Sequence, residues 1–139
     1  LPGPLIAWIG DQAALYDLNS LPLLHKTKQP VWLVISNNFG GGIFSHLPIA
    51  NATEHFEKLW INSHTFEFSH MAKQFDLPYN RVDSMADFVT SYKALPQKSA
   101  IIELISSREQ NYAFYKKLLF GISQSPCSTT CLEPPPNGC

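Results

Sequence analysis

Short apolar runs recur along the chain, separated by polar residues, glycine or proline. Leu5–Ile9, Val31–Ile35 and Ser99–Ile105 are almost wholly apolar, which is the pattern of strands buried on both faces of a sheet. Leu77–Val82 is a candidate for a fourth, shorter strand. Strands of this kind are typical of parallel sheets that helices cover on both sides, so the pattern predicts a buried sheet.

Segments with apolar residues at helical spacing lie between these strands. The first covers Ala13–Lys26, where Pro22 requires either a kink or a new helix with Ser20 as its N-cap. Further helices are expected over Glu54–Leu59, Phe66–Phe75, Met85–Leu95 and Arg108–Ile122. Asp83-Ser84 is expected to cap the third of these, and the last is amphipathic. Because strands alternate with helices, we expect a three-layer α/β/α domain with a mainly parallel sheet.

The size and composition fit one globular domain. The chain has 139 residues, of which 45% are hydrophobic and 15% charged. We expect residues 1–125 to form the domain and residues 126–139, rich in Pro, Ser and Cys, to be a disordered tail. All three cysteines lie in that tail, so no disulfide is expected within the domain, and a full zinc ligand set is missing. The chain starts without Met directly before a strand, which we interpret as a fragment of a longer protein.

The charge pattern argues against two classes of partner. The formal net charge is −1 and the Lys and Arg residues are scattered, so no nucleic-acid partner is expected. No apolar stretch approaches the roughly 20 residues that span a bilayer, and no signal peptide is recognisable. We therefore expect a cytoplasmic protein without a membrane partner.

Two polar pairs follow two of the expected strands and carry the candidate chemistry. Gly10-Asp11 comes directly after the first strand, and Asn37-Asn38 follows the second. A crossover helix between parallel strands would bring Asp11 and Asn38 to the same carboxyl edge of the sheet, where ligands of open α/β sheets bind. A carboxylate and an amide oxygen suit Mg²⁺, and the run Gly40–Gly42 allows close approach of backbone groups to an ion or a diphosphate. Each pair alone is more typical of a surface turn, but together they predict magnesium-bridged diphosphate binding.

This arrangement resembles the signature of thiamine-diphosphate enzymes, which is Gly-Asp-Gly, a spacer and then Asn-Asn. Gln12 stands where that signature has its second glycine, and in the menaquinone-pathway synthases called MenD this position is often not glycine. The stretches Gly10–Leu21, Asn37–Pro48 and Phe66–His70 also resemble that branch. The resemblance covers roughly residues 4 to 122 and implies the C-terminal, thiamine-diphosphate-binding domain of such an enzyme.

The resemblance implies roles for individual residues. The implied ligands of Mg²⁺, or of Mn²⁺ in its place, are Asp11, the side chain of Asn38 and the backbone carbonyl of Gly40. Asn37 is expected to organise the turn, and Phe39 stands where the family often has asparagine. Further contacts to the diphosphate, or to the thiazolium ring and substrate, are implied for Gly10, Gln12, Ala13, Gly41, Ile43 and Phe44.

The resemblance also implies an activity and partners. Enzymes of this branch decarboxylate 2-oxoglutarate and add the resulting succinyl carbanion equivalent to isochorismate. Their activating glutamate comes from an N-terminal domain, normally that of a second subunit, so the intact enzyme is expected to be at least a dimer. Glu54, Glu57, Glu67 and Glu103 do not lie in the context expected of that residue. We therefore expect no catalytic residue in this chain and no catalysis by the chain alone.

Two other functions stay open from the sequence. The chain could belong to another thiamine-diphosphate decarboxylase or lyase, similar to acetolactate synthase, or it could be a non-catalytic interaction module that retains the fold. The histidines do not show the spacing of a helical zinc motif. We expect His70 to be a half-buried packing residue, whereas His46 either packs or faces the site. Trp8 and Trp32 are expected to fill the core.

Overall fold

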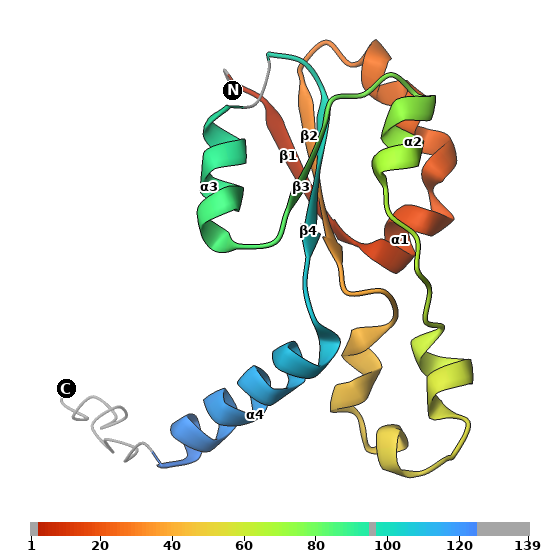
Figure 1. The fold of residues 1–139 in the computed structure, drawn as a ribbon, viewed down its shortest axis with the longest axis vertical. Helices are drawn as coiled ribbons and strands as arrows, with labels where there is room; N and C mark the ends of the chain where they lie inside the picture. The colour runs from red at the N-terminus through yellow and green to blue at the C-terminus, as the bar shows by residue number, and fades with distance from the viewer. Residues whose placement is uncertain (1–2, 95–96, 125–139) are drawn as a thin grey trace, which may run out of the picture.

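The computed structural model describes residues 3–94 and 97–124. Its centre is a four-stranded sheet in which every neighbouring pair is parallel, in the order β1-β2-β4-β3 (Figure 1). The strands are β1 (Leu5–Gly10), β2 (Val31–Asn37), β3 (Tyr79–Val82) and β4 (Ala100–Ile105). The expected tail, residues 126–139 with its cysteines, lies outside the described residues.

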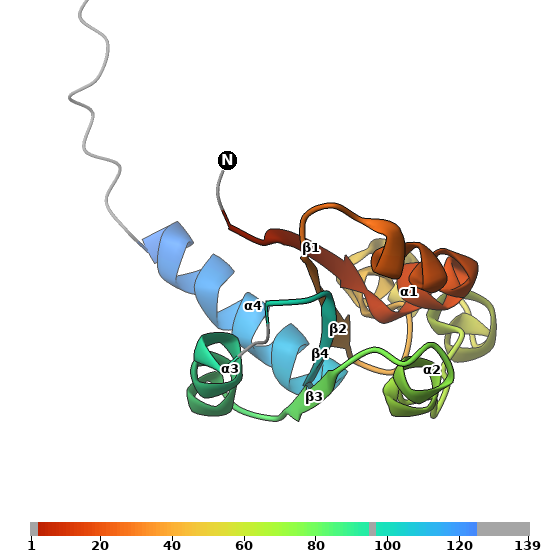
Figure 2. The ribbon, with the colours of Figure 1, turned by 90° about the horizontal axis from the view of Figure 1, so that it is seen from above.

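Helices cover both faces of this sheet. The α-helices are α1 (Asp11–Tyr16), α2 (Ser69–Gln74), α3 (Met85–Lys93) and α4 (Arg108–Gln124). Shorter turns are the 3₁₀ helices Leu18–Lys26, Gly42–His46 and Pro48–Asn51 and the π-helix Glu57–Ile61. α1 and α2 lie on one face, α3 lies on the other, and α4 extends away from the end of β4 (Figure 2). The predicted three-layer fold with a parallel sheet is confirmed.

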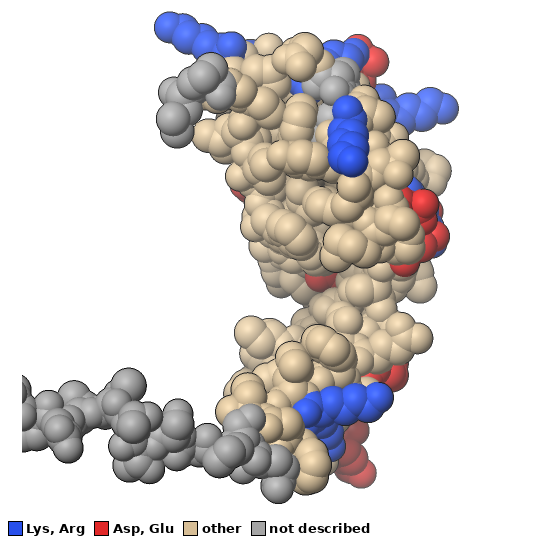
Figure 3. Space-filling model, turned by 90° about the vertical axis from the view of Figure 1, so that its left-hand side faces the viewer, with Lys and Arg blue, Asp and Glu red and all other residues tan. Residues whose placement is uncertain are grey.

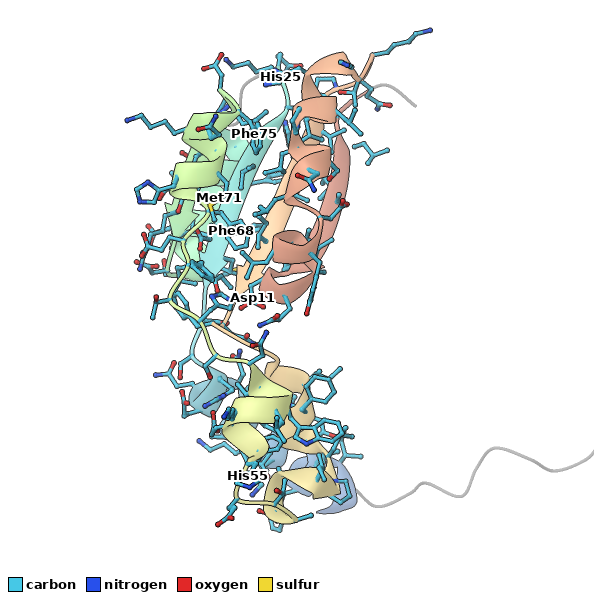
Figure 4. All side chains as sticks on the ribbon, turned by 90° about the vertical axis from the view of Figure 1, so that its right-hand side faces the viewer. Asp11, His25, His55, Phe68, Met71 and Phe75 are labelled. Atoms are coloured by element: carbon cyan, nitrogen blue, oxygen red, sulfur yellow. The ribbon has the colours of Figure 1, made fainter. Side chains whose placement is uncertain are left out.

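The core consists of two apolar clusters, one on each face of the sheet. On one face, α2 packs against the sheet. Met71 of α2 points towards the strands, as do Phe68 and Phe75, which flank the two ends of this helix (Figure 4). On the other face, Trp32 and Val34 of β2 pack with Val82 and with residues of β4 under α3. None of the helices in the described part of the chain has the length and apolarity that crossing a bilayer requires.

β1 is not the buried strand that its apolar sequence predicts. Leu5, Ile6 and Trp8 are about half exposed, Trp8 to 59%. The reason is position, because β1 is an edge strand with only β2 beside it. Trp8 therefore lies on the surface, where its ring nitrogen donates to the Ser36 hydroxyl at 2.6 Å. Trp32 on the neighbouring strand is buried, as expected.

The helix expected over Ala13–Lys26 is two elements that meet at Asp17. α1 ends at Tyr16, and the amide of Asp17 reaches back only three residues, to the carbonyl of Ala14. The amide of Ser20 bonds in the same way to the carbonyl of Asp17, so a 3₁₀ helix starts at Leu18 and runs through Pro22. Neither the kink at Pro22 nor the new start at Ser20 is observed.

Two further predicted helices are shorter than expected. Residues 62–67 form neither helix nor strand, and the Asn37 side chain takes the Phe66 carbonyl, which the first hydrogen bond of a helix starting at Phe66 would need. The helix expected over Glu54–Leu59 is instead the π-helix that starts at Glu57. By contrast, α3 starts where predicted, with the Ser84 hydroxyl accepting from the amide of Asp87 at 3.1 Å.

α4 is the long helix predicted at the end of the domain, but most of it does not pack on the sheet. Its apolar residues from Phe114 onwards are largely exposed. Near its start, the His46 ring lies 5.3 Å from that of Tyr112 and 4.3 Å from that of Tyr115. His46 therefore packs against α4. The side of the molecule that carries α3 is covered mostly by uncharged residues (Figure 3).

Candidate functional site

Asp11 lies where β1 passes into α1, beside the end of β2. The register places Gly10 next to Ser36, so the residues that follow both strands meet at the same edge of the sheet. Figure 4 shows Asp11 there, below the strands and next to the loop segments. The Gly40 amide donates to Asp11 Oδ2 at 2.9 Å, so the glycine run that follows Asn37-Asn38 lies against the end of β1.

The Asp11 carboxylate is buried, with 3% of the residue exposed, and is held by three donors. Oδ2 accepts from the Gly40 amide and from His64 Nε2, the latter at 3.1 Å. Oδ1 accepts from the adjacent amide of Gln12 at 2.7 Å. A buried carboxylate with this pattern is oriented rather than free to rotate, and Oδ1 keeps the larger unused accepting capacity.

Asn37 organises the turn, as expected from the sequence. Its Oδ1 accepts from the Phe39 amide at 3.0 Å, and its Nδ2 donates to the Phe66 carbonyl at 3.0 Å. Nδ2 also donates to Glu103 Oε1 at 2.6 Å. The side chain of Asn37 is therefore fully engaged within the protein and fixes the start of the glycine loop.

Asn38 carries a buried polar atom that the described residues leave unsatisfied. Its Oδ1 is buried and accepts no hydrogen bond from the part of the chain that the structure describes. An unpaired buried acceptor costs about 1–3 kcal/mol, so such atoms are uncommon unless a ligand, an ion or water completes them. A cation or donor at this position would satisfy Asn38.

The glycine loop is packed too tightly for larger residues. Phe39 and Gly40 have positive φ angles of 61° and 151°. A Cβ on Gly40 would lie 2.9 Å from the Ile61 carbonyl oxygen, and one on Gly41 would lie 2.8 Å from that of Trp60. The Gly41 amide donates to Ile61 at 2.6 Å. Glycine is therefore required for this loop to lie against the π-helix.

The remaining residues implied by the resemblance lie around this loop. Gln12 donates from Nε2 to the Asn62 carbonyl at 3.0 Å, and Phe44 packs edge-on against Trp60. Gln12, Phe44, Trp60 and Asn62 line part of a cavity of about 510 Å³. Ala13 and Ile43 are exposed, Ile43 to 72%. The structure thus groups Gln12, Gly41 and Phe44 on one cavity but leaves Ala13 and Ile43 on the surface.

A second cavity, of about 580 Å³, lies on the side of the loop towards β3 and β4. Asn38, Phe39 and His64 line it, together with Arg81 and Arg108. Both guanidinium groups are paired with carboxylates: Arg81 with Glu67 and Asp83, and Arg108 with Glu57 and Glu109. Their positive charge is therefore largely balanced within the protein.

Glu103 is a buried carboxylate that joins three segments around the site. It lies on β4 with no exposed surface and accepts from Asn37, from the Phe68 amide at 2.9 Å and from the Tyr79 hydroxyl at 2.6 Å. Burial and the hydrogen bond to Glu103 raise the pKa of the Tyr79 phenol well above its usual value. Glu103 thus holds Asn37, Phe68 and Tyr79 together.

The sequence did not indicate the contact of His64 with Asp11, and the burial expected for His70 was wrong. His64 stands among several histidines without a motif, and residues 62–67, which form neither helix nor strand, bring it to Asp11. His70, expected to be half-buried, is exposed on α2. The reason is that α2 buries the face containing Phe68 and Ala72.

The residues present can supply few anionic metal ligands. Within the described ranges, no three side chains of His, Cys, Asp or Glu lie together as a metal-binding group. A metal at this edge would depend on the single carboxylate of Asp11 and on neutral oxygens. That donor set suits magnesium, which usually takes one or two carboxylates and completes its shell with phosphate and water.

No family model matches the chain. In sequence it is similar to curated 2-succinyl-5-enolpyruvyl-6-hydroxy-3-cyclohexene-1-carboxylate synthases. With that of Chlorobium phaeobacteroides it shares 39% identity over 83% of this chain and 20% of the relative. With that of Shewanella baltica it shares 45% identity over 73% of this chain and 18% of the relative. The chain thus spans about one fifth of the length of these relatives.

Solved structures share the fold. A thiamine diphosphate-dependent 4-hydroxybenzoylformate decarboxylase from Rhodococcus jostii RHA1 matches with a TM-score of 0.63 and 27% identity, over 75% of this chain and 20% of that protein. A benzoylformate decarboxylase from Polynucleobacter necessarius matches with a TM-score of 0.64 and 17% identity, over 76% of this chain and 20% of that protein. The second likeness concerns the fold alone.

Proposed function

From the match of this chain to one fifth of the 2-succinyl-5-enolpyruvyl-6-hydroxy-3-cyclohexene-1-carboxylate synthases, we propose that it is the C-terminal, magnesium- and diphosphate-binding domain of such an enzyme. The complete enzyme is a thiamine diphosphate-dependent transferase of menaquinone biosynthesis. Its substrates are 2-oxoglutarate, which it decarboxylates, and isochorismate, which accepts the succinyl unit.

One observation carries this proposal: the buried carboxylate of Asp11 and the unsatisfied Oδ1 of Asn38 belong to the same edge of the sheet. Magnesium requires hard oxygen ligands, and the unpaired amide oxygen of Asn38 and the oriented carboxylate of Asp11, at the same edge of the sheet, would supply two of them. The tight glycine loop adds backbone groups that larger residues would block. These features fit a magnesium diphosphate.

Each part of the site then has a defined task. Asp11, the Asn38 side chain and the Gly40 carbonyl would hold the metal, and the backbone of Gln12 and Gly41 would hold the diphosphate. Phe44 would shield the adjoining cavity from water. When bound, thiamine diphosphate supplies the carbanion-stabilising chemistry, while the protein binds and orients it.

The activating glutamate is proposed to come from outside this chain, in an N-terminal domain of a second subunit. Glu103 cannot replace it, because three donors from the protein surround its carboxylate. Glu57 and Glu67 are at the surface in ion pairs with arginines. The chain alone is therefore expected to form no product from 2-oxoglutarate and isochorismate, and product formation would contradict the proposal.

Calorimetric titration of the chain with thiamine diphosphate, with and without Mg²⁺, tests the site. We expect binding that requires Mg²⁺ and is lost in Asp11→Ala, since that change removes the only anionic ligand. Asp17→Ala, at an exposed position just after α1, is the matched control and should bind normally. Binding that is independent of Mg²⁺, or unaffected by Asp11→Ala, would contradict the proposal.

A second candidate is another thiamine diphosphate-dependent decarboxylase. The structural likeness to the Rhodococcus jostii enzyme, at 27% identity, favours it over unrelated functions. The complete protein distinguishes the two, because the leading proposal requires turnover of 2-oxoglutarate with isochorismate and the alternative requires turnover of an arylglyoxylate such as 4-hydroxybenzoylformate. A chain without any metal-dependent binding would instead favour a non-catalytic interaction module.

A further inference from the structure

His64 lies in residues 62–67, a segment without helix or strand that connects the π-helix Glu57–Ile61 to α2. Its side chain is 6% exposed, and its Nε2 lies 3.1 Å from Oδ2 of Asp11, whose side chain is 4% exposed. Because both side chains are almost fully buried, their hydrogen bond to each other replaces hydrogen bonds that they would otherwise make to water. The pair is therefore a defined part of the site.

The hydrogen bonds of His64 fix the direction of this contact. The Phe66 amide donates to His64 Nδ1 at 3.2 Å, so Nδ1 is the accepting nitrogen of the ring. The ring proton is then on Nε2, which donates to the Asp11 carboxylate. Phe66 stacks on the ring at 5.5 Å and Phe39 meets it edge-on at 6.0 Å. Tautomer and ring position are thus both determined by the protein.

His64 also joins Asp11 to the glycine loop. Its backbone amide donates to the Phe39 carbonyl at 3.2 Å, directly before Gly40. Gly40 in turn donates to the same oxygen of Asp11, Oδ2, that His64 holds. With two donors on Oδ2, the carboxylate is turned so that Oδ1 is the oxygen with spare accepting capacity.

We propose that His64 is a positioning residue that orients the Asp11 carboxylate for magnesium. The inference rests on the proposed function, because it assigns the metal to Asp11. Hydrogen bonds to a ligating carboxylate fix its orientation, and loss of such a partner typically lowers metal affinity about 10- to 100-fold. A histidine that serves only as packing would affect stability and leave metal affinity unchanged.

The test compares the 139-residue chain with three variants, using Mn²⁺ titration in the presence of thiamine diphosphate. Free Mn²⁺ is followed by electron paramagnetic resonance, and a thermal melt of each variant reports folding. His64→Ala removes the donor to Asp11. His64→Gln keeps an N–H donor at the end of the side chain. His70→Ala removes an exposed histidine on α2 and is the matched control.

We expect His64→Ala to bind Mn²⁺ about 10- to 100-fold more weakly, with His64→Gln recovering most of the affinity and His70→Ala matching the unchanged chain. Equal or tighter binding by His64→Ala would overturn the inference and leave the proposed function standing. The inference would also be overturned if His64→Gln lost as much Mn²⁺ affinity as a folded His64→Ala. If His64→Ala does not fold, His64→Phe, which keeps an aromatic ring but has no donor, takes its place with the same expected and contradicting results. Absence of metal binding by the unchanged chain would overturn the proposed function and the inference with it.

Discussion

At the scale of single residues, the glycine loop shows how local geometry restricts sequence. Gly40 has a φ of 151°, a conformation that side-chain-bearing residues rarely adopt, and its missing Cβ leaves room for Ile61. The Gly40 backbone amide is one of the donors to the Asp11 carboxylate. The site thus requires a residue without a side chain at position 40 as well as the polar side chain of Asp11.

Gly40→Ala is expected to lower the free energy of unfolding by about 1–3 kcal/mol, because the new Cβ strains the backbone and meets Ile61. Gly121→Ala is the control: it lies within α4, where a Cβ meets nothing within 4 Å, and should stabilise by roughly 0.5–1 kcal/mol. Urea denaturation of both variants measures the difference. Equal stabilities would show that the loop can relax around the added methyl group.

Tyr79 provides a prediction about pH. Burial, followed by its hydrogen bond to Glu103, raises the pKa of the phenol. Because the folded pKa lies above the unfolded value of about 10, this contribution to stability is present below pH 10 and declines as pH rises above it. Tyrosinate absorbance should show a step at high pH that Tyr79→Phe removes. If Tyr79→Phe instead removed an absorbance step close to pH 10, the pKa of Tyr79 would not be raised.

Some residues of the site follow from the sequence and others do not. Asp11, Asn37 and Asn38 could be placed at one edge of the sheet, because a strand and a crossover dictate where its end lies. His64 could not, since its contact depends on a segment that forms neither helix nor strand and has no periodic pattern. Glu103 could not either, because a single acidic residue within an apolar strand does not reveal its partners.

At the scale of elements, position in the sheet decides what each apolar run contributes. β1 and β4 have similar sequences, yet β1 is half exposed at an edge while β4 lies buried between β2 and β3. Sequence periodicity predicts that a strand exists, but the order of strands depends on pairing between distant segments. The exposure of Trp8 therefore could not be predicted from the apolar sequence of β1.

Matched substitutions in the two strands test this difference. Ile101→Ala in β4, at a fully buried position, should lower the free energy of unfolding by about 2–5 kcal/mol. Ile6→Ala in β1, where the residue is 48% exposed, should cost about 1 kcal/mol or less. Denaturant midpoints at an unchanged slope report both values. A cost for Ile6→Ala as large as that for Ile101→Ala would show that β1 is covered in solution.

The helices show a similar limit. Segments with a clear cap or a strong apolar face were located to within a few residues, as for α3 behind Ser84. The start of α2 was not, because the Asn37 side chain takes the Phe66 carbonyl, which the first hydrogen bond of a helix starting at Phe66 would need. Competition of this kind arises only from the folded arrangement.

At the scale of the whole molecule, two elements each carry several exposed large apolar residues. One is β1, with Leu5, Ile6 and Trp8, and the other is α4, from Phe114 to Ile122. The chain spans about one fifth of the length of its curated relatives, so much of such a protein would lie outside it. The two exposed surfaces are therefore consistent with the proposal of a partner domain.

The proposed function requires that residues 10–13 and 37–44 together bind a magnesium diphosphate. Amide-resolved NMR of the chain, recorded with thiamine diphosphate plus Mg²⁺ and again with a chelator, tests this most directly. We expect chemical-shift changes that need Mg²⁺ and centre on residues 10–13 and 37–44, with the β1 edge strand before Gly10 and the exposed part of α4 unchanged. Shifts centred elsewhere, or the same shifts with the chelator present, would contradict it.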